Sequence, residues 1–338
     1  MWHEVDRILV GTYRFGRLAT GAVLSCAFLI APGVSSAQDT AKYPVRPIRL
    51  VVPFPPGGGT DIMGRNLEGR IGQLLGQQVV VDNRTGAGGA IGSAEVARAK
   101  PDGYTLLLGT SSTHVINQLA MDNLQYDAVK SFAAINMLGI GTYVIVAHPS
   151  VASSLPELIR RAKASPGKYS YGAVSGMAQM SGELFKQKAG VDILHVPYRL
   201  TGQNLLDLMG GQIPLTSTVL SVATPHHRSG KLRIVSVFAA KRSSAVPEVP
   251  TALEGGVAGM IAYTFNILFA PAGTARPVID QLYQATAKVV RDEGFQKSAE
   301  GLGIEPITDS SPEKAAQVVK DEIAKWAPVV KATGMTVN

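Results

Sequence analysis

Residues 50–61 read Leu-Val-Val-Pro-Phe-Pro-Pro-Gly-Gly-Gly-Thr-Asp, and this stretch constrains the fold more than any other part of the chain. A β-branched run that stops at proline and then glycine is typical of a strand that ends at a turn. Thr60 and Asp61, both good N-cap residues, come next, and apolar residues at helical spacing follow them. The stretch therefore predicts a strand, a glycine turn and a helix whose N-terminus faces the turn.

Such a turn is a candidate anion site. The N-terminus of a helix offers backbone N–H groups without intrahelical partners, and it is the positive end of the helix dipole. Three consecutive glycines let the backbone approach a ligand closely, because they lack a Cβ. The alternative is a tight loop with no ligand. A second copy of the pattern favours the anion site, since a strand predicted over residues 79–82 is followed by Gly86-Ala87-Gly88-Gly89 and a helix from about Ile91.

The N-terminal segment has the features of a secretory signal peptide. Three arginines precede an apolar stretch at residues 18–30, and Ser35-Ser36-Ala37 is a small-x-small cleavage pattern. A transmembrane anchor is the alternative, but the apolar run is interrupted and short for the ~20 residues that a span needs. We predict a signal peptide over residues 1–37 and a periplasmic location.

The cysteine count limits how the exported chain is stabilised. Its one cysteine, Cys26, lies within the predicted signal, so the mature chain has no disulfide and depends on a large core, which it can build as two domains. Residues 23–26 faintly resemble a lipoprotein box, and whether Cys26 carries a lipid is left open by the sequence.

The charge pattern gives no indication of nucleic-acid binding. The formal net charge is +7, but the basic residues are scattered and form no long run or aromatic-interleaved patch. An anionic small molecule as ligand, or an ordinary soluble surface, accounts for this charge.

The order of predicted elements indicates an α/β protein with two domains. Three strand–loop–helix units follow one another, and their loops would meet beyond the carboxyl ends of parallel strands, where ligands bind in such sheets. Residues 141–262 can form an α/β unit of their own, and residues 43–140 with 263–338 would form the other domain, so that a hinged cleft separates two lobes. In the middle unit we expect strands at residues 142–147, 169–174, 192–196 and 232–238, and helices at residues 155–164 and 204–209.

Catalytic and cofactor signatures are missing from the sequence. It contains no Gly-x-Ser-x-Gly elbow, no His-Glu-x-x-His and no pair of cysteine ligands. The His226-His227 pair is predicted to lie in a solvated loop and not to form a metal site. Gly86-x-Gly88 resembles a dinucleotide fingerprint only weakly, because Ile91 stands where the third glycine belongs. We therefore predict no enzyme activity, no cofactor and no metal.

Several polar residues have two interpretations each. Asp61 can cap the helix or accept a hydrogen bond from a ligand amino group or an ordered water. Ser111 and Ser112, which follow a strand predicted at residues 104–108, can be caps or ligand contacts. Tyr198 belongs either to the core or to the wall of the cleft.

Taken together, the motifs resemble a known family. Pro53-Phe54-Pro55-Pro56-Gly57-Gly58-Gly59-Thr60-Asp61, Val81-Asp82-Asn83-Arg84 with Gly86-Ala87-Gly88-Gly89, and Lys100-Pro101-Asp102-Gly103-Tyr104 occur in order, and His195-Val196-Pro197-Tyr198 and Ala270-Pro271-Ala272-Gly273-Thr274 continue the match. The chain is similar, from Tyr43 to its C-terminus, to the substrate-binding proteins of tripartite tricarboxylate transporters, the Bordetella uptake gene family.

The resemblance implies a two-lobed periplasmic-binding-protein fold of type II, in which each lobe is a mixed sheet flanked by helices. It also implies a monomeric, non-catalytic protein that captures a small carboxylate in the cleft through backbone amides of two glycine loops and delivers it to a membrane permease. A sensor that presents the ligand to a membrane histidine kinase is the alternative. The candidate ligand-binding residues are Phe54, Pro55, Gly57, Gly58, Thr60, Asp61, Gly86, Ala87, Gly88, Ser111, Ser112, Ser175 and Tyr198.

The departures from the family pattern lie mainly in the second lobe. The loop at residues 175–179 is shorter than usual and has Gln179 near the usual histidine position. Arg199-Leu200 replaces the Lys-Gly that the family favours, and Phe265 stands where tryptophan is common. The identity of the bound acid therefore does not follow from the resemblance.

Overall fold

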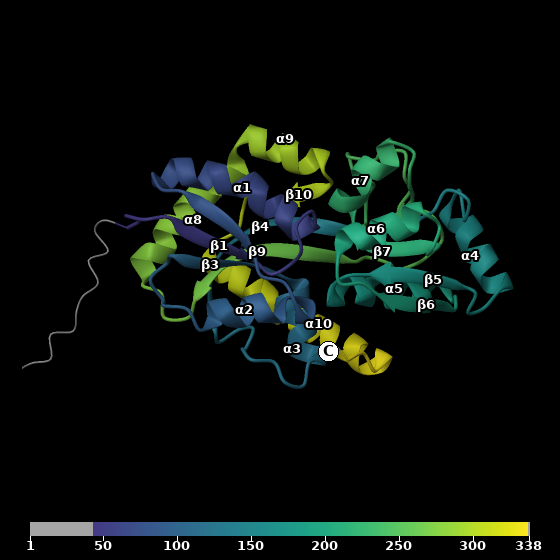
Figure 1. Ribbon diagram of the computed structural model, residues 1–338, viewed down its shortest axis with the longest axis horizontal. Helices are drawn as coiled ribbons and strands as arrows, with labels where there is room; N and C mark the ends of the chain where they lie inside the picture. The colour runs from purple at the N-terminus through teal and green to yellow at the C-terminus, as the bar shows by residue number, and fades with distance from the viewer. Residues whose placement is uncertain (1–42, 337–338) are drawn as a thin grey trace, which may run out of the picture. The chain divides into compact units, whose positions relative to one another are not determined.

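Two groups of strands share one long strand, β4 (Phe132–Ala147), in the computed structural model, which describes residues 43–336. Residues 132–142 of β4 pair with β9 (Tyr263–Pro271), and β10 (Ile304–Pro306) also pairs with this part. Residues 143–147 of the same strand pair with β7 (Leu215–Val219), and residues 144–147 also pair with β8 (Arg233–Val237). We call the first group sheet A and the second group sheet B. The shared strand runs from one group into the other (Figure 1).

Sheet A has the parallel strands that the sequence predicts, followed by antiparallel ones. β1 (Ile48–Val52) lies between β2 (Val79–Asn83) and β3 (Thr105–Thr110), and all three are parallel, whereas β9 is antiparallel to both β3 and β4. Leu50, Val51 and Val52 in β1 are all buried, as expected for a strand that is covered on both faces. The loops that follow β1, β2 and β3 therefore lie at the same edge of the sheet.

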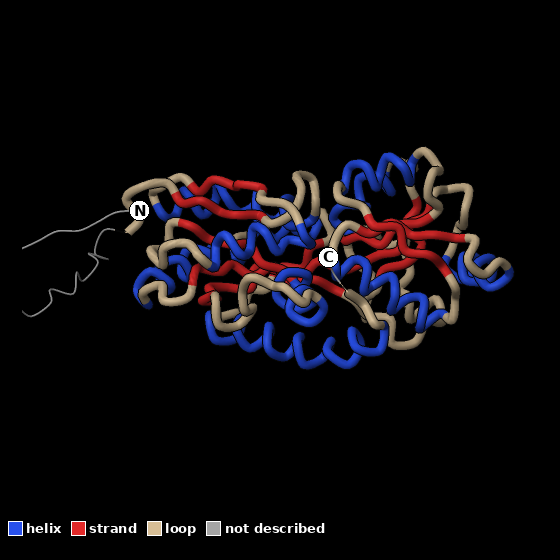
Figure 2. Tube along the Cα trace, turned by 60° about the horizontal axis from the view of Figure 1, so that its bottom comes forward, coloured by secondary structure: helices blue, strands red, loops and turns tan. Residues whose placement is uncertain are grey.

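Helices cover both faces of sheet A (Figures 1 and 2). On one face, the apolar stripe of α1 packs in one cluster with α8 and α9; on the other face lie α2, α3 and α10. The stripe on α1 consists of Met63, Leu67 and Ile71, whose spacing places them on one side of a helix. The helices span Gly59–Leu75 (α1), Ala90–Ala97 (α2), Asn117–Ala120 (α3), Arg276–Arg291 (α8), Glu293–Gly301 (α9) and Pro312–Thr333 (α10).

Sheet B is smaller and is also sandwiched between helices. Its strands run in the order β4, β7, β5 (Tyr169–Ala173) and β6 (Ile193–Pro197), with β8 pairing to β4. Apolar residues of α6 (Thr201–Met209) and α7 (Leu220–Arg228) form one cluster against it, and those of α5 (Gly176–Ala189) and α4 (Leu155–Ala164) belong to another.

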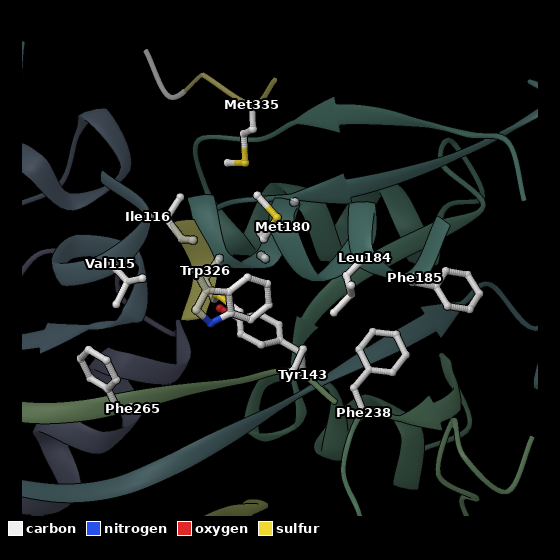
Figure 3. Close-up of a cluster of buried hydrophobic side chains, with 14 of the residues drawn as sticks. Val115, Ile116, Tyr143, Met180, Leu184, Phe185, Phe238, Phe265, Trp326 and Met335 are labelled. Carbon is white, nitrogen blue, oxygen red and sulfur yellow. The ribbon is translucent and has the colours of Figure 1, made fainter. Parts of the chain in front are cut away.

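One hydrophobic cluster extends beneath β4 from sheet A to sheet B. Figure 3 shows Trp326 of α10 beside Tyr143 of β4, with Met180 of α5 close by. The same cluster reaches Phe265 in sheet A and Phe238 after β8. The two sheets therefore share part of their core, and α10 contributes to it.

Two predictions about single elements were wrong. β4 begins at Phe132 and not at residue 142, because residues 132–142 pair with β9, a partner that is distant in the chain. Residues 215–228, for which we predicted only a loop around His226-His227, form β7 and α7. Short elements α9 and β10 were also missed. Within residues 43–336, no helix combines the length and the apolar character that crossing a membrane requires.

Candidate functional site

The turn between β1 and α1 has the predicted form but a different cap. The helix begins at Gly59, its N-cap is Gly58, and no side chain caps it, so the prediction that Thr60 or Asp61 is the N-cap was wrong. The reason is that the carboxylate of Asp61 instead accepts the backbone N–H of Gly57, which precedes the helix, at 2.9 Å. Because no side chain accepts them, the amides of the first turn of α1 are free for another acceptor.

The second glycine loop, residues 86–89, packs against Phe54, which precedes the first glycine loop. Gly86, Ala87, Gly88 and Gly89 all have positive φ angles, so the chain makes a tight turn that only small residues tolerate. An added Cβ at Gly89 would lie 3.1 Å from Cζ of the Phe54 ring, which shows how closely the loop packs against that ring.

The polar residues after β3 connect elements of both sheets. The Ser111 hydroxyl accepts the backbone N–H of Phe265 at 3.1 Å, within sheet A. The Ser112 hydroxyl accepts the backbone N–H of Met177, in the first turn of α5, at 3.0 Å. Ser112 and Met177 are both buried, so this bond joins the loop after β3 to the sheet B side.

Two predicted residues of the second lobe have clear structural roles. Ser175 is the N-cap of α5, and its hydroxyl accepts the N–H of Ala178 at 3.2 Å. Tyr198 donates its hydroxyl proton to Asp207 at 2.8 Å, and its ring packs against the apolar cluster of α6 and α7.

A pocket lies where β4 passes from sheet A to sheet B. It is partly enclosed by protein and partly open to solvent. Six predicted residues line it: Phe54, Pro55, Gly58, Thr60, Ser112 and Ser175. Seven do not: Gly57, Asp61, Gly86, Ala87, Gly88, Ser111 and Tyr198. The second glycine loop is thus not part of the pocket wall, whereas the Phe54 ring that it supports is.

Sequence reasoning missed more than half of the pocket wall. The missed part includes Gly59, Thr110, Gly141, Tyr143, Val174, Ala178, Thr201, Asn204, Ser217, Thr218, Val219, Ser221, Val222, Thr264, Asn266 and Ile304. The β-branched run at residues 215–219, followed by a helical stretch, was a usable signal for a further strand–helix unit.

No charged side chain is among the residues that line the pocket. Its wall consists of hydroxyl, amide and apolar groups. One ionisable phenol, Tyr143, is buried in its wall, and burial raises its pKa to about 12, although the hydroxyl groups of Ser175, Ser112 and Thr264 act to lower it. The side chains of the pocket therefore carry no charge near neutral pH.

Three helices begin at this pocket without a side-chain cap. They are α1, with N-cap Gly58; α6, with N-cap Leu200; and α7, with N-cap Val219. Their starts lie close together, since a Cβ added at Gly58 would be 3.5 Å from the hydroxyl of Thr201, and one at Gly59 would be 2.5 Å from a methyl group of Val219. Uncapped N-termini that converge in this way favour an anion.

Three buried polar atoms in the pocket have no hydrogen-bond partner in the protein. They are Thr110 Oγ1, Asn204 Nδ2 and Asn266 Oδ1, and each residue is at most 3% exposed. The Thr216 hydroxyl lies 2.6 Å from the other amide atom of Asn204 and holds that side chain in place. Buried polar groups nearly always have a partner, so these three atoms are exceptions within the part of the chain that the structure describes.

The histidine pair at 226–227 lies in a helix and not in the predicted loop. Both residues lie in the last turn of α7, where His227 accepts the backbone N–H of Ile234 and its other ring nitrogen lies 3.0 Å from Glu248. In the part of the chain that the structure describes, no three His, Cys, Asp or Glu side chains are grouped to hold a metal ion.

Comparison with known proteins gives a consistent result. A sequence model of the tripartite tricarboxylate transporter family receptor matches residues 63–335. BugT of Bordetella pertussis is 34% identical over 311 residues, which cover 91% of this chain and 95% of BugT. The structure of R. palustris Rpa4515 with adipate is 32% identical with a TM-score of 0.84, and covers 87% of this chain and 99% of that one. The structure of the periplasmic binding protein BugD is 32% identical with a TM-score of 0.82, and covers 87% and 99%. The predicted two-lobed fold class is thereby confirmed.

Proposed function

The chain belongs to the tripartite tricarboxylate transporter receptor family, and from this premise we propose that it is a periplasmic protein that captures a small carboxylate and delivers it to a permease of that transporter class. The observation that carries the proposal is the meeting of three uncapped helix N-termini in a pocket without charged side chains. A carboxylate placed there accepts hydrogen bonds from first-turn amides and needs no arginine or lysine. Rpa4515, whose structure has adipate, supports the ligand class.

Residues from both sheets would hold the ligand. Phe54, Gly58 and Thr60 come from the sheet A side, and Ser175 and Thr201 come from the sheet B side. We propose that residues 43–140 with 263–338, and residues 141–262, form two lobes that close on the ligand. The change of pairing partners within β4 at residues 142–143 supports this division.

Export is part of the same proposal. The predicted signal peptide at residues 1–37 lies outside the described residues, so the sequence pattern and the family carry this point. Detection of a chain that begins after Ala37 in a periplasmic extract would support it, and a full-length chain retained in the cytoplasm would contradict it.

A thermal-shift screen tests the ligand class. We expect at least one acid in a panel of mono-, di- and tricarboxylates, aromatic acids and acidic amino acids to raise the melting temperature. A ligand at a hundredfold excess over its dissociation constant stabilises the folded state by about 2.7 kcal/mol. Neutral analogues of the same length, such as dimethyl adipate and 1,6-hexanediol for adipate, are the matched controls. If no acid stabilises the protein, or if the neutral analogues stabilise it equally, carboxylate capture is refuted.

Delivery to a permease needs a separate experiment. The chain loaded with its best acid should retain transporter membrane subunits from detergent-solubilised membranes of its source bacterium more strongly than the ligand-free chain. Equal or no retention of these subunits would count against delivery while leaving capture intact.

A further inference from the structure

A network of three side chains lies beneath the turn between β1 and α1. Asp61 is 3% exposed, and one of its carboxylate oxygens accepts the N–H of Gly57 and the Nε–H of Arg65, at 2.9 and 3.0 Å. Its other oxygen accepts the side-chain amide of Asn83 at 3.0 Å. Both oxygens of Asp61 therefore have partners, and none of the three side chains lines the pocket.

Asn83, at the end of β2, joins this network to the turn itself. Its amide nitrogen donates to the backbone carbonyl of Phe54 at 2.9 Å as well as to Asp61, and its amide oxygen accepts from Arg65 at 3.2 Å. The two ends of the turn are thus fastened to one another, since Phe54 is held by Asn83 and Gly57 is held by Asp61.

The negative charge of Asp61 lies in the first turn of α1, close to the proposed anion site, so a nearby positive charge must offset it. A carboxylate in the first turn of a helix is favoured by the helix dipole, but it also repels an anion that binds at the same N-terminus. Burial alone would raise the pKa of Asp61, yet the hydrogen bonds from Arg65, Gly57 and Asn83 outweigh burial and lower it, so the side chain stays ionised. Arg65 lies against the carboxylate and offsets its negative charge.

We propose that Asp61, Asn83 and Arg65 are positioning residues, which hold the turn at residues 54–57 so that the first amides of α1 face the pocket. The proposal rests on the proposed function, because the amides that it orients are the ones that would hold the carboxylate. Donors that are fixed before binding lose less conformational freedom when the ligand arrives. The network therefore supports affinity without contact with the ligand.

Removal of the Asn83 amide tests whether the network holds the turn at residues 54–57. The Asn83→Ala variant loses the bonds to Phe54 and Asp61, and we expect the Gly57 amide of the ligand-free protein to exchange hydrogen at least roughly tenfold faster, since its acceptor is no longer fixed. For the best acid of the thermal-shift panel, we expect a dissociation constant raised about tenfold, equivalent to about 1.4 kcal/mol. Asp82→Asn is the matched control, because the neighbouring Asp82 pairs with Arg49 and Arg84 instead of the turn.

Arg65→Gln tests whether Arg65 offsets the negative charge of Asp61. The variant should fold, because the Arg65 side chain is about half exposed (51%). It leaves Asp61 ionised without its cation, so the carboxylate of the panel acid should bind several-fold more weakly at low salt. Screening should reduce this loss at 0.5 M salt, which a purely structural defect would not show. Arg70→Gln, on the same helix with its bonds to Asn66, is the control and should bind as the wild type does.

The outcomes separate this inference from the proposed function. If the Gly57 amide exchanges as before in Asn83→Ala, or exchanges faster with no loss of affinity, the positioning role is overturned. If Arg65→Gln loses the same affinity at both salt concentrations, the role of Arg65 in offsetting the negative charge of Asp61 is overturned. If the wild type binds no acid of the panel, both the proposed function and the contribution of the network to affinity are refuted. The hydrogen-exchange measurement still shows whether the network fixes the turn.

Discussion

Gly59 lies where the N-terminus of α1 meets the start of α7, and its substitution tests whether ligand binding requires these two helix starts to stay in contact. A Cβ built on Gly59 would lie 2.5 Å from Cγ2 of Val219 and 3.2 Å from the hydroxyl oxygen of Ser221. The first distance is shorter than carbon atoms tolerate, so one side must move. Gly59 has no left-handed φ, so alanine fits its backbone, and the conflict arises only across the pocket.

The size of the effect follows from overpacking. Forcing an extra carbon into a well-packed contact costs typically about 1–3 kcal/mol. If this cost falls only on the closed arrangement, the dissociation constant of Gly59→Ala should rise by roughly 5- to 150-fold, at about 1.4 kcal/mol for each tenfold change. The stability of the ligand-free protein should change little, since alanine is a better helix former than glycine by about 1 kcal/mol.

Isothermal titration calorimetry with the best acid of the panel, together with ligand-free thermal unfolding, gives both quantities. Gly69→Ala is the matched control, because Gly69 lies on the same helix with no atom within 4 Å of an added Cβ. We expect Gly69→Ala to bind as the wild type does. Equal affinity for the wild type and both variants would refute the reasoning, and so would a Gly59→Ala variant that loses its fold.

Three further predictions concern the pocket and its surroundings. Ser112→Ala removes the acceptor of the buried Met177 N–H, which should cost about 1–3 kcal/mol and lower the melting temperature, whereas an unchanged melting curve would show that the bond contributes nothing. Affinity for a carboxylate should be constant between pH 6 and pH 9 in calorimetry, because Tyr143, with its pKa raised to about 12, is the one ionisable side chain among the lining residues; a titration step in this range would contradict a neutral pocket. His114 is fully buried, and burial lowers its pKa to about 3, so the unfolded chain takes up a proton below about pH 6.5 and the folded chain does not. Stability should therefore fall as the pH drops from 6.5 towards 3, and His114→Asn should show a smaller fall in denaturant titrations; an equal fall would assign the effect to other groups.

The sheet A side of the site could be predicted because its signals are local. A buried run, a proline and three glycines lie within a few residues of one another, and they specify the strand, the turn and the start of α1. The position of the cap could not be predicted in this way. It depends on Asn83, which lies 22 residues beyond Asp61 in the chain and draws the Asp61 carboxylate towards the turn.

Most of the sheet B side, apart from Ser175, was missed for a different reason. Residues 217–222 reach the pocket only because β7 pairs with the far end of β4, and this pairing joins residues 68 to 76 positions apart in the chain. Pro225 and the two histidines also made the segment look like a loop, although it forms α7. Residue patterns within one segment do not encode such pairings, and so Tyr143 and Asn204 were not recognised as pocket residues.

The convergence of helix ends explains how a neutral pocket can couple binding to closure. The N-termini of α1 on one side and of α6 and α7 on the other carry partial positive charge, and like charges repel when they approach. A carboxylate between them reverses the sign of this interaction, and it accepts hydrogen bonds from both sides at once. Neither side alone offers all the donors, because Gly59 belongs to one and Thr201 to the other. In the proposed function the ligand would therefore gain most of its interactions when the two sides meet, and such a differential affinity is what any ligand needs to shift a conformational equilibrium.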